Sequence, residues 1–327
     1  MNARIRVVAT TFAATLSLTA APGSAFGQDI TLQYHWTKGE EVRQRVVFQS
    51  TSTVSGLPDN VAAGEVDTRL SQVVRTVVED VAPDGTATLR SVFESIRWET
   101  KTPRETMVFD SESSDPANAS APAALKDMLT ALVGQTLVVV MAPSGQVQKV
   151  DGMSRIIEKA TQGANPDPST APLVETLRSN FGDDQLRNVL TRGSIAFPDR
   201  PLRLGDTWNG SATMTIPVVG AQTTTTVFTL KDVDNSSGSR VATIATRVTT
   251  QNTGEPKTGV AGLKMRVTDS SGEGEMIFDV TNGRLLRSTT RMTALTDMSM
   301  NGPGGNVMNL QTKSTSTMSI EQLQPSK

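Results

Sequence analysis

Apolar and polar residues alternate with a period of two along most of this chain, and this alternation restricts the possible folds more than any other feature. A clear case lies near the C-terminal end, where charged Arg287, Arg291 and Asp297 share one parity. The opposite parity carries Leu286, Met292, Ala294, Met298 and Met300. This pattern is typical of β-strands with one face on a core and the other in water. The sequence therefore predicts long antiparallel strands with one wet face.

The same alternation recurs elsewhere along the chain. Near the end, Met308, Leu310, Met318 and Ile320 share a parity opposite to polar residues, and residues 30–36 alternate in the same way. Two β-branched segments, 66–81 and 86–99, flank the turn-forming sequence Pro83-Asp84-Gly85. The chemistry of this turn predicts a hairpin between the two segments.

The middle of the chain has a different pattern. Residues 111–122 are rich in Ser, Ala, Asp and Pro, which indicates an exposed loop. Pro122 and Gly134 bracket a segment with helical spacing of leucines, as expected at the two ends of a helix. The sequence predicts helices over 123–133, 153–162, 171–179 and 183–191, and a short hairpin over 135–150.

These elements predict a mainly β fold with an α insertion, of the α+β class. We expect a large curved antiparallel sheet, or two related sheets, with the helices packed on one face. A weak internal similarity supports two halves, because Lys38-Gly39-Glu40 and Leu204-Gly205-Asp206 each precede a strand. The predicted divisions are a β half (28–110), a helical section with a hairpin (111–200) and a second β half (201–327), together forming one continuous domain.

The first 27 residues have the features of a secretory signal peptide. Arg4 and Arg6 precede an apolar stretch over 7–21, and Ala25-Phe26-Gly27 offers small residues for cleavage. The alternative is a membrane anchor, but a run of about 15 residues is shorter than the roughly 20 that span a bilayer. We therefore expect an exported protein, periplasmic or extracellular, that is cleaved near Gly27.

Several catalytic chemistries lack the residues that they need. The chain has no cysteine and only one histidine, His35, on the polar side of its predicted strand. A Ser-His-Asp mechanism would have only His35 as its base, a Cys-His mechanism lacks its cysteine, and zinc sites made of His and Cys need several such ligands. Phosphate-binding and dinucleotide-binding glycine motifs are absent as well. The sequence thus predicts a non-enzymatic protein without a cofactor, although a pair of carboxylates acting as in a glycosidase stays open.

Three local clusters allow both a structural and a functional interpretation. Residues 232–238 resemble the start of a calcium loop, but the glycine is displaced and Asp and Asn also form turns. The acidic loop 110–115 is better explained as solvated, so no metal ligand is predicted. Methionine adapts to irregular apolar ligands, although an ordinary core face explains the pattern equally well. The candidate ligand-binding residues are Met292, Met298, Met300, Met308 and Leu310.

Two short motifs carry a resemblance to a known group. Residues 34–40 read Tyr-x-Trp-x-x-Gly-Glu, and residues 198–208 read Pro-x-x-Pro-x-x-x-Gly-Asp-x-Trp. The chain thus resembles a family of uncharacterised secreted bacterial proteins, which has no assigned activity and so implies no catalytic residue. We expect structural roles for Gly205 and Asp206 in a tight turn, and for the aromatic anchors Trp208 and Trp36.

The expected architecture looks like the half-barrel of periplasmic lipoprotein carriers, in which helices cover a concave apolar surface. Three functions remain open at this level: a structural or protein-interaction module of the envelope, a carrier for a lipid or other apolar ligand, and a carboxylate-dependent glycosidase. After removal of residues 1–27 the chain holds 29 basic and 33 acidic residues. That balance does not favour a nucleic-acid partner, and no segment after residue 27 predicts a transmembrane span.

Overall fold

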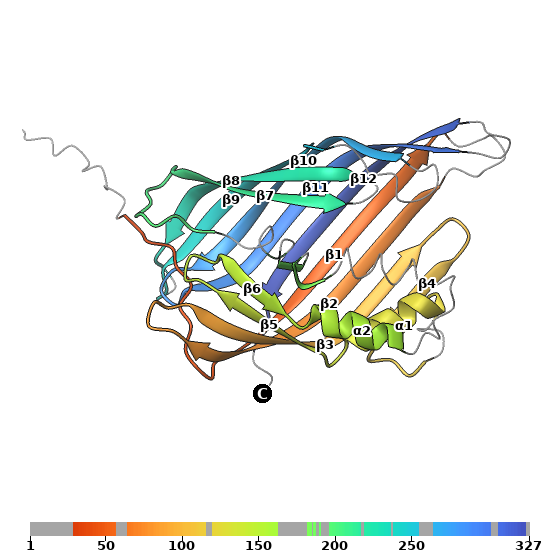
Figure 1. Ribbon diagram of the computed structural model, residues 1–327. Helices are drawn as coiled ribbons and strands as arrows, with labels where there is room; N and C mark the ends of the chain where they lie inside the picture. The colour runs from red at the N-terminus through yellow and green to blue at the C-terminus, as the bar shows by residue number, and fades with distance from the viewer. Residues whose placement is uncertain are drawn as a thin grey trace, which may run out of the picture.

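The computed structural model contains one continuous antiparallel sheet of twelve strands (Figure 1). It describes residues 29–56, 64–115, 120–162, 182–184, 186–187, 190, 196–216, 219–236, 238–254, 264–301 and 307–324. The expectation of a mainly β protein is confirmed, whereas the alternative of two separate sheets is wrong. The last strand of the chain pairs with the first, and this pairing joins the two halves into one sheet.

The strands follow the order β6-β5-β3-β2-β1-β12-β11-β10-β9-β8-β7, with β4 paired to β3 beside β5. Each half is therefore a meander that runs outward from the central pair of β1 and β12. The first half contains β1 Glu41–Ser55, β2 Glu65–Val81, β3 Ala87–Lys101, β4 Thr106–Asp110, β5 Thr136–Met141 and β6 Val147–Asp151. The second contains β7 Thr207–Ile216, β8 Gly220–Asp234, β9 Val241–Asn252, β10 Lys264–Asp279, β11 Arg284–Asn301 and β12 Val307–Gln322.

Two helices of ten residues each, α1 Ala123–Leu132 and α2 Met153–Gln162, lie where the sequence predicts helices. The predicted α insertion is thus smaller than an α+β class implies. The predicted helix over 171–179 lies outside the described residues, and that over 183–191 is described only in part. No helix within the described ranges is long and apolar enough to cross a membrane.

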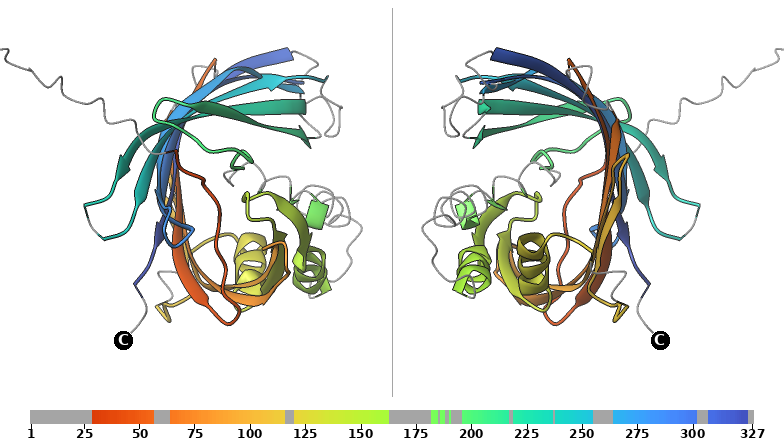
Figure 2. Two further views of the ribbon diagram at one scale, coloured as in Figure 1. Left: turned by 90° about the vertical axis from the view of Figure 1, so that its left-hand side faces the viewer. Right: turned by 90° about the vertical axis from the view of Figure 1, so that its right-hand side faces the viewer.

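The sheet is strongly curved, and both helices lie on the side toward which it curves (Figure 2). We call this side the concave face. Helix α1 packs against it through Leu129, which shares a small apolar core with Ile96 and Phe109 of β3 and β4. The helices therefore cover the part of the concave face formed by the first half of the sheet.

A larger core closes one end of the curved sheet, where β1 begins and where hairpin β2–β3 and hairpin β8–β9 turn. We call this region the closed end. Its core combines residues from β2, β3 and β5–β10 with those of the segment 30–36. Fully buried members include Ile30, Leu32, Leu202, Leu230, Ile244 and Phe278.

The sequence predicted a sheet strand over residues 30–36, and the structure corrects this prediction. The segment is extended, but its only bridge is an isolated antiparallel one between Ile30 and Leu202. The backbone N–H of Tyr34 donates to the carbonyl of Pro143, and that of His35 donates to Gly283. Alternate side chains are buried because the segment crosses the closed end and fills it. The alternation with a period of two is therefore present in the structure. It arises because alternate side chains are buried against several turns, and not because the segment is a strand of the sheet.

The internal similarity seen in the sequence has a structural counterpart in two matching turns. The N–H of Gly39 donates to the carbonyl of Val78, whose own N–H donates to Glu40. In the second half, Gly205 donates to Leu230, and Leu230 donates to Asp206. Both glycines have positive φ, 83° and 87°, which an L-residue adopts only at a cost. The same device thus anchors the start of β1 and of β7 at the closed end.

Candidate functional site

The registers of the strands identify every residue of the concave face, because directly opposed residues in an antiparallel pair share a face. One row starts at Phe48 of β1 and extends in both directions across the sheet. Nearly the whole width of the molecule contributes to this row. Its members are Phe109, Trp98, Leu70, Phe48, Met318, Thr290, Gly274, Thr246, Phe228 and Trp208.

None of the residues that these registers place on the concave face of the described strands is Asp, Glu, Lys or Arg. The charged residues of the strands lie on the convex face. There, Glu94 at a bulge of β3 accepts hydrogen bonds from Arg43 and Arg75. Charges are therefore segregated by face, and the concave face is lined only by apolar side chains, hydroxyls and amides.

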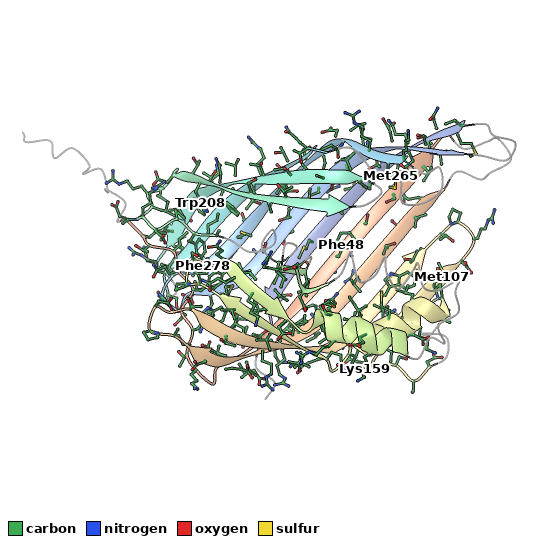
Figure 3. The ribbon with its side chains drawn as sticks, in the orientation of Figure 1. Phe48, Met107, Lys159, Trp208, Met265 and Phe278 are labelled. Atoms are coloured by element: carbon green, nitrogen blue, oxygen red, sulfur yellow. The ribbon has the colours of Figure 1, made fainter. Side chains whose placement is uncertain are left out.

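The concave face is covered at the closed end and uncovered further along the same strands. Phe278 is 0 % exposed, whereas Phe48 and Met318, which are opposed in β1 and β12, are 39 % and 41 % exposed. Figure 3 shows Phe278 and Trp208 at the closed end, and Phe48 further along the sheet. We call this uncovered region the open half; it is formed by β1, β10, β11 and β12 beyond Phe48. Two large apolar side chains thus face solvent on the inner side of a curved sheet.

A hollow of about 840 Å³ lies at the tips of these strands. Its apolar lining includes Met265, Met298 and Leu310, which are opposed to one another across β10, β11 and β12. Charged residues at the strand tips line it as well, namely Lys264, Arg266 and Asp297. Figure 3 places Met265 at the end of the sheet opposite to Phe278. Its volume is within the range of small-molecule sites, about 300–1,000 Å³.

The predicted ligand-binding residues lie on the concave face, but not all in one place. Met298 and Leu310 are opposed and line the hollow. Met300 and Met308 are the next opposed pair on that face, although the side chain of Met300 lies outside the described residues. Met292 is further from the tips, opposed to Ser316 and Gly272. Four of the five candidates therefore lie at the strand tips, in or next to the hollow. The fifth, Met292, lies between the hollow and Phe48.

The predicted structural residues all lie at the closed end. Gly205 and Asp206 form the turn before β7, where the Asp206 carboxylate accepts from Arg200 and from the Arg203 N–H. The bond from Arg200 is the main reason why the pKa of Asp206 is lowered. Trp208 stacks on Phe228 with ring centroids 5.3 Å apart.

Trp36 connects the segment 30–36, which fills the closed end, to the sheet. Its ring stacks on Tyr34 at 5.7 Å, and the Arg284 guanidinium lies 4.7 Å from its centroid. Arg284 also pairs with Glu40, with Nε 2.9 Å from Oε1. Burial raises the pKa of the Tyr34 hydroxyl well above its usual range. These contacts explain how the segment is fixed in place.

The other clusters noted in the sequence have ordinary local partners. Residues 232–234 end strand β8, and in the turn that follows, the Ser236 N–H donates to the Asp234 carboxylate. In the acidic loop, Asp110 pairs with Arg97. His35 is exposed. Within the described ranges no group of three His, Cys, Asp or Glu residues is placed to hold a metal ion.

Sequence reasoning missed that Phe48 and Met318 form one exposed pair. In each strand the apolar residues share one parity, so the apolar face of each strand could be predicted separately. No local signal indicates that the first strand pairs with the last, because the partners are distant in sequence. Met265 was missed because only a short stretch of alternation precedes the bulge at Thr268 of β10.

The fold and the site define a class: a strongly curved, open antiparallel sheet with an uncharged concave face that is plugged at one end. The sequence matches the model of the Family of unknown function (DUF6263) over residues 84–284, and the chain belongs to that family. This fits the expectation of an uncharacterised domain. A search of curated proteins gave no significant match.

Solved structures with some likeness include lipovitellin, at 9 % identity and a TM-score of 0.43. The alignment covers 89 % of this chain but only 26 % of lipovitellin. DynF from the dynemicin pathway of Micromonospora chersina matches with 8 % identity and a TM-score of 0.20, over 96 % and 95 % of the two chains. An outer membrane channel of Pseudomonas putida matches with 8 % identity and 0.21, over 93 % and 100 %. These values establish neither a shared fold nor a shared function.

Proposed function

We propose that this protein is an exported, non-enzymatic binding protein that holds an apolar, lipid-like ligand on the open half of its concave face. The observation that carries the proposal is the pair Phe48 and Met318, exposed at uncharged ladder positions on the same face as Met265 and Met298, which line the hollow. Burying one such side chain is worth about 1.5–3 kcal/mol. A ligand that follows the curve would gain this energy from several side chains at once.

A non-enzymatic role is supported by the same segregation of charges. General acids and bases must reach hydrogen-bonding distance of the substrate. At the ladder positions of the described concave face there is no carboxylate, amine or imidazole. A molecule on these ladder positions would meet only apolar groups, hydroxyls and amides, while charged side chains line the hollow at the strand tips. Nothing in this arrangement favours the carboxylate-dependent enzyme.

Native mass spectrometry of the purified mature protein and titration with the neutral dye Nile red test the proposal. Phe48→Asn with Met318→Gln should weaken dye binding at least tenfold, because each tenfold corresponds to about 1.4 kcal/mol. The matched control is Val47→Asn, which lies on the same strand but on the convex face. The control should change affinity by less than about twofold. The absence of both a co-purified lipid and dye binding would contradict the proposal.

A protein-interaction role is the second candidate, and the edge of the sheet favours it. Strand β7 ends the sheet, and among the described residues it has a neighbouring strand on only one side. The free backbone groups of such an edge can pair with an extended segment of a partner. Crosslinking from a photoreactive residue at Thr213, which is exposed on β7, should then capture a partner in cells. If the residue at Thr213 captures no partner, while a photoreactive residue at Met318 captures a ligand, the result would support the ligand-binding role and not the protein-interaction role.

A further inference from the structure

Four serines form a polar belt across the middle of the open half. Ser50 is opposed to Ser316, and Ser52 is opposed to Ser314, on the concave face of β1 and β12. All four are half-buried, and none has a side-chain hydrogen-bond partner among the described residues. We call these four residues the serine belt. Its hydroxyls are available to a ligand.

The belt lies between two apolar regions of the same face. On one side is the pair Phe48 and Met318, and on the other are Leu310 and Met298 at the hollow. Along β12 the distance from Met318 to Leu310 is about 27 Å, at about 3.4 Å per residue. The concave floor is thus apolar, then hydroxyl-lined, then apolar again along the strands.

A neighbouring hydroxyl strengthens the case for a polar subsite. Thr312, opposed to Val54 and Thr296 just beyond the belt, has a buried Oγ1 without a hydrogen-bond partner among the described residues. Buried polar groups are normally satisfied, so an unpaired hydroxyl at this place needs an explanation. A ligand oxygen near the belt could supply the missing partner or order a water that does.

The absence of charge at the serine belt restricts the ligand further. The belt and the residues opposed to it are uncharged, whereas Lys264, Arg266 and Asp297 line the hollow further along the strands. A carboxylate or phosphate at the belt would lose its hydration without a cation beside it, which is costly. A hydroxyl or ester oxygen needs only hydrogen-bond donors, and serine hydroxyls provide these. We infer that the open half binds an uncharged lipid whose hydroxyl or ester linkage lies at the serine belt, with apolar chains extending to both sides. This inference rests on the proposed function and names its ligand class.

Three probes separate the possibilities: oleyl oleate, which has a central ester, dioleyl phosphate, which has two oleyl chains around a central anion, and squalene, a hydrocarbon without a polar group. Because the chains of the first two match, oleyl oleate should bind the full-length mature protein at least tenfold more tightly than dioleyl phosphate at about pH 8. Squalene is the reference that cannot accept a hydrogen bond from the serine belt.

The variant Ser50→Ala with Ser316→Ala should lower the affinity for oleyl oleate about threefold to tenfold and leave squalene binding unchanged. The matched control is Thr317→Ala with Ser319→Ala, on the convex face of the same strand, and it should change neither. Binding of dioleyl phosphate as tight as that of oleyl oleate, or an equal loss for oleyl oleate and squalene in the serine variant, would overturn the inference while the proposed function stands. If no probe binds and no lipid co-purifies, both this inference and the proposed function fail.

Discussion

The closed end and the open half are two regions of one concave face, and β10 runs through both, but they bury very different amounts of apolar surface. Phe278 of β10 is packed against Tyr34 and Phe197, with ring centroids 5.3 Å and 4.8 Å away. Phe48 of β1 has no such cover and is 39 % exposed. The alternation is equally regular in both regions. It specifies which face of a sheet is apolar, while the covering elements decide whether that face is a core or a binding surface.

Replacing an aromatic residue in each region should show the largest contrast. We expect Phe278→Ala to lower the free energy of unfolding by about 3–5 kcal/mol, the usual cost of removing a buried aromatic side chain. Phe48→Ala should cost less than about 1 kcal/mol, as for most exposed positions. Urea denaturation of both variants measures the difference. Similar losses would mean that the open half is packed as a core.

The contact between Arg284 and Glu40 should be the next largest contribution at the closed end. The Arg284 side chain is 12 % exposed and also lies over Trp36. Arg284→Met should cost about 2 kcal/mol, between the values for exposed pairs and those for fully buried ones. The control is Arg287→Met, whose side chain is 62 % exposed and lies 4.0 Å from Glu275. It should cost less than about 0.5 kcal/mol, and an equal loss in both variants would contradict the role of Arg284.

The closed end should also weaken at high pH through Tyr34. Burial raises the pKa of this hydroxyl above its ordinary value of 10.0, so the folded state keeps a proton that the unfolded state loses. The stabilisation is fully present below about pH 10 and falls as the pH rises further, by about 1.4 kcal/mol for each pH unit. Tyr34→Phe should remove this slope in urea unfolding measurements. Because Tyr34 is the only tyrosine, tyrosinate absorbance reports its ionisation directly; ionisation near pH 10 in the folded protein would contradict the prediction.

The elements that could be predicted from the sequence are those defined by neighbouring residues. The hairpin of β2 and β3, the hairpin of β5 and β6, and both described helices lie close to their predicted bounds. The two faces of β12, and those of β11 from Arg287 onward, are confirmed as well, because no bulge interrupts their mutual ladder. Leu286, which the sequence placed on the apolar face, lies at an irregularity, where Leu285 is instead opposed to Phe278. In each case a turn, a cap or a regular period carried the information locally.

What could not be predicted depends on contacts between distant residues. In β3 the bulge at Glu94 changes the inward parity from Ala87 and Leu89 to Ile96 and Trp98, so one period does not describe the strand. The pairing of β1 with β12 decides that the sheet is single, and it has no local signature. The candidate site therefore appeared only as separate apolar stripes, and the serine belt was not visible in the sequence.

The smallest predicted effect concerns the two matching turns that anchor β1 and β7. Gly39 and Gly205 have positive φ, and a Cβ at either position would meet no atom within 4 Å. The cost of Gly39→Ala and of Gly205→Ala should therefore come from the backbone alone, about 1 kcal/mol each. Thermal or urea unfolding of the single and double variants measures this, and the losses should be equal within about 0.5 kcal/mol and additive. Equal costs would indicate that the closed end is built by the same device in both halves. A clearly larger loss at one glycine would show that the two turns have different structural roles despite their common hydrogen bonds.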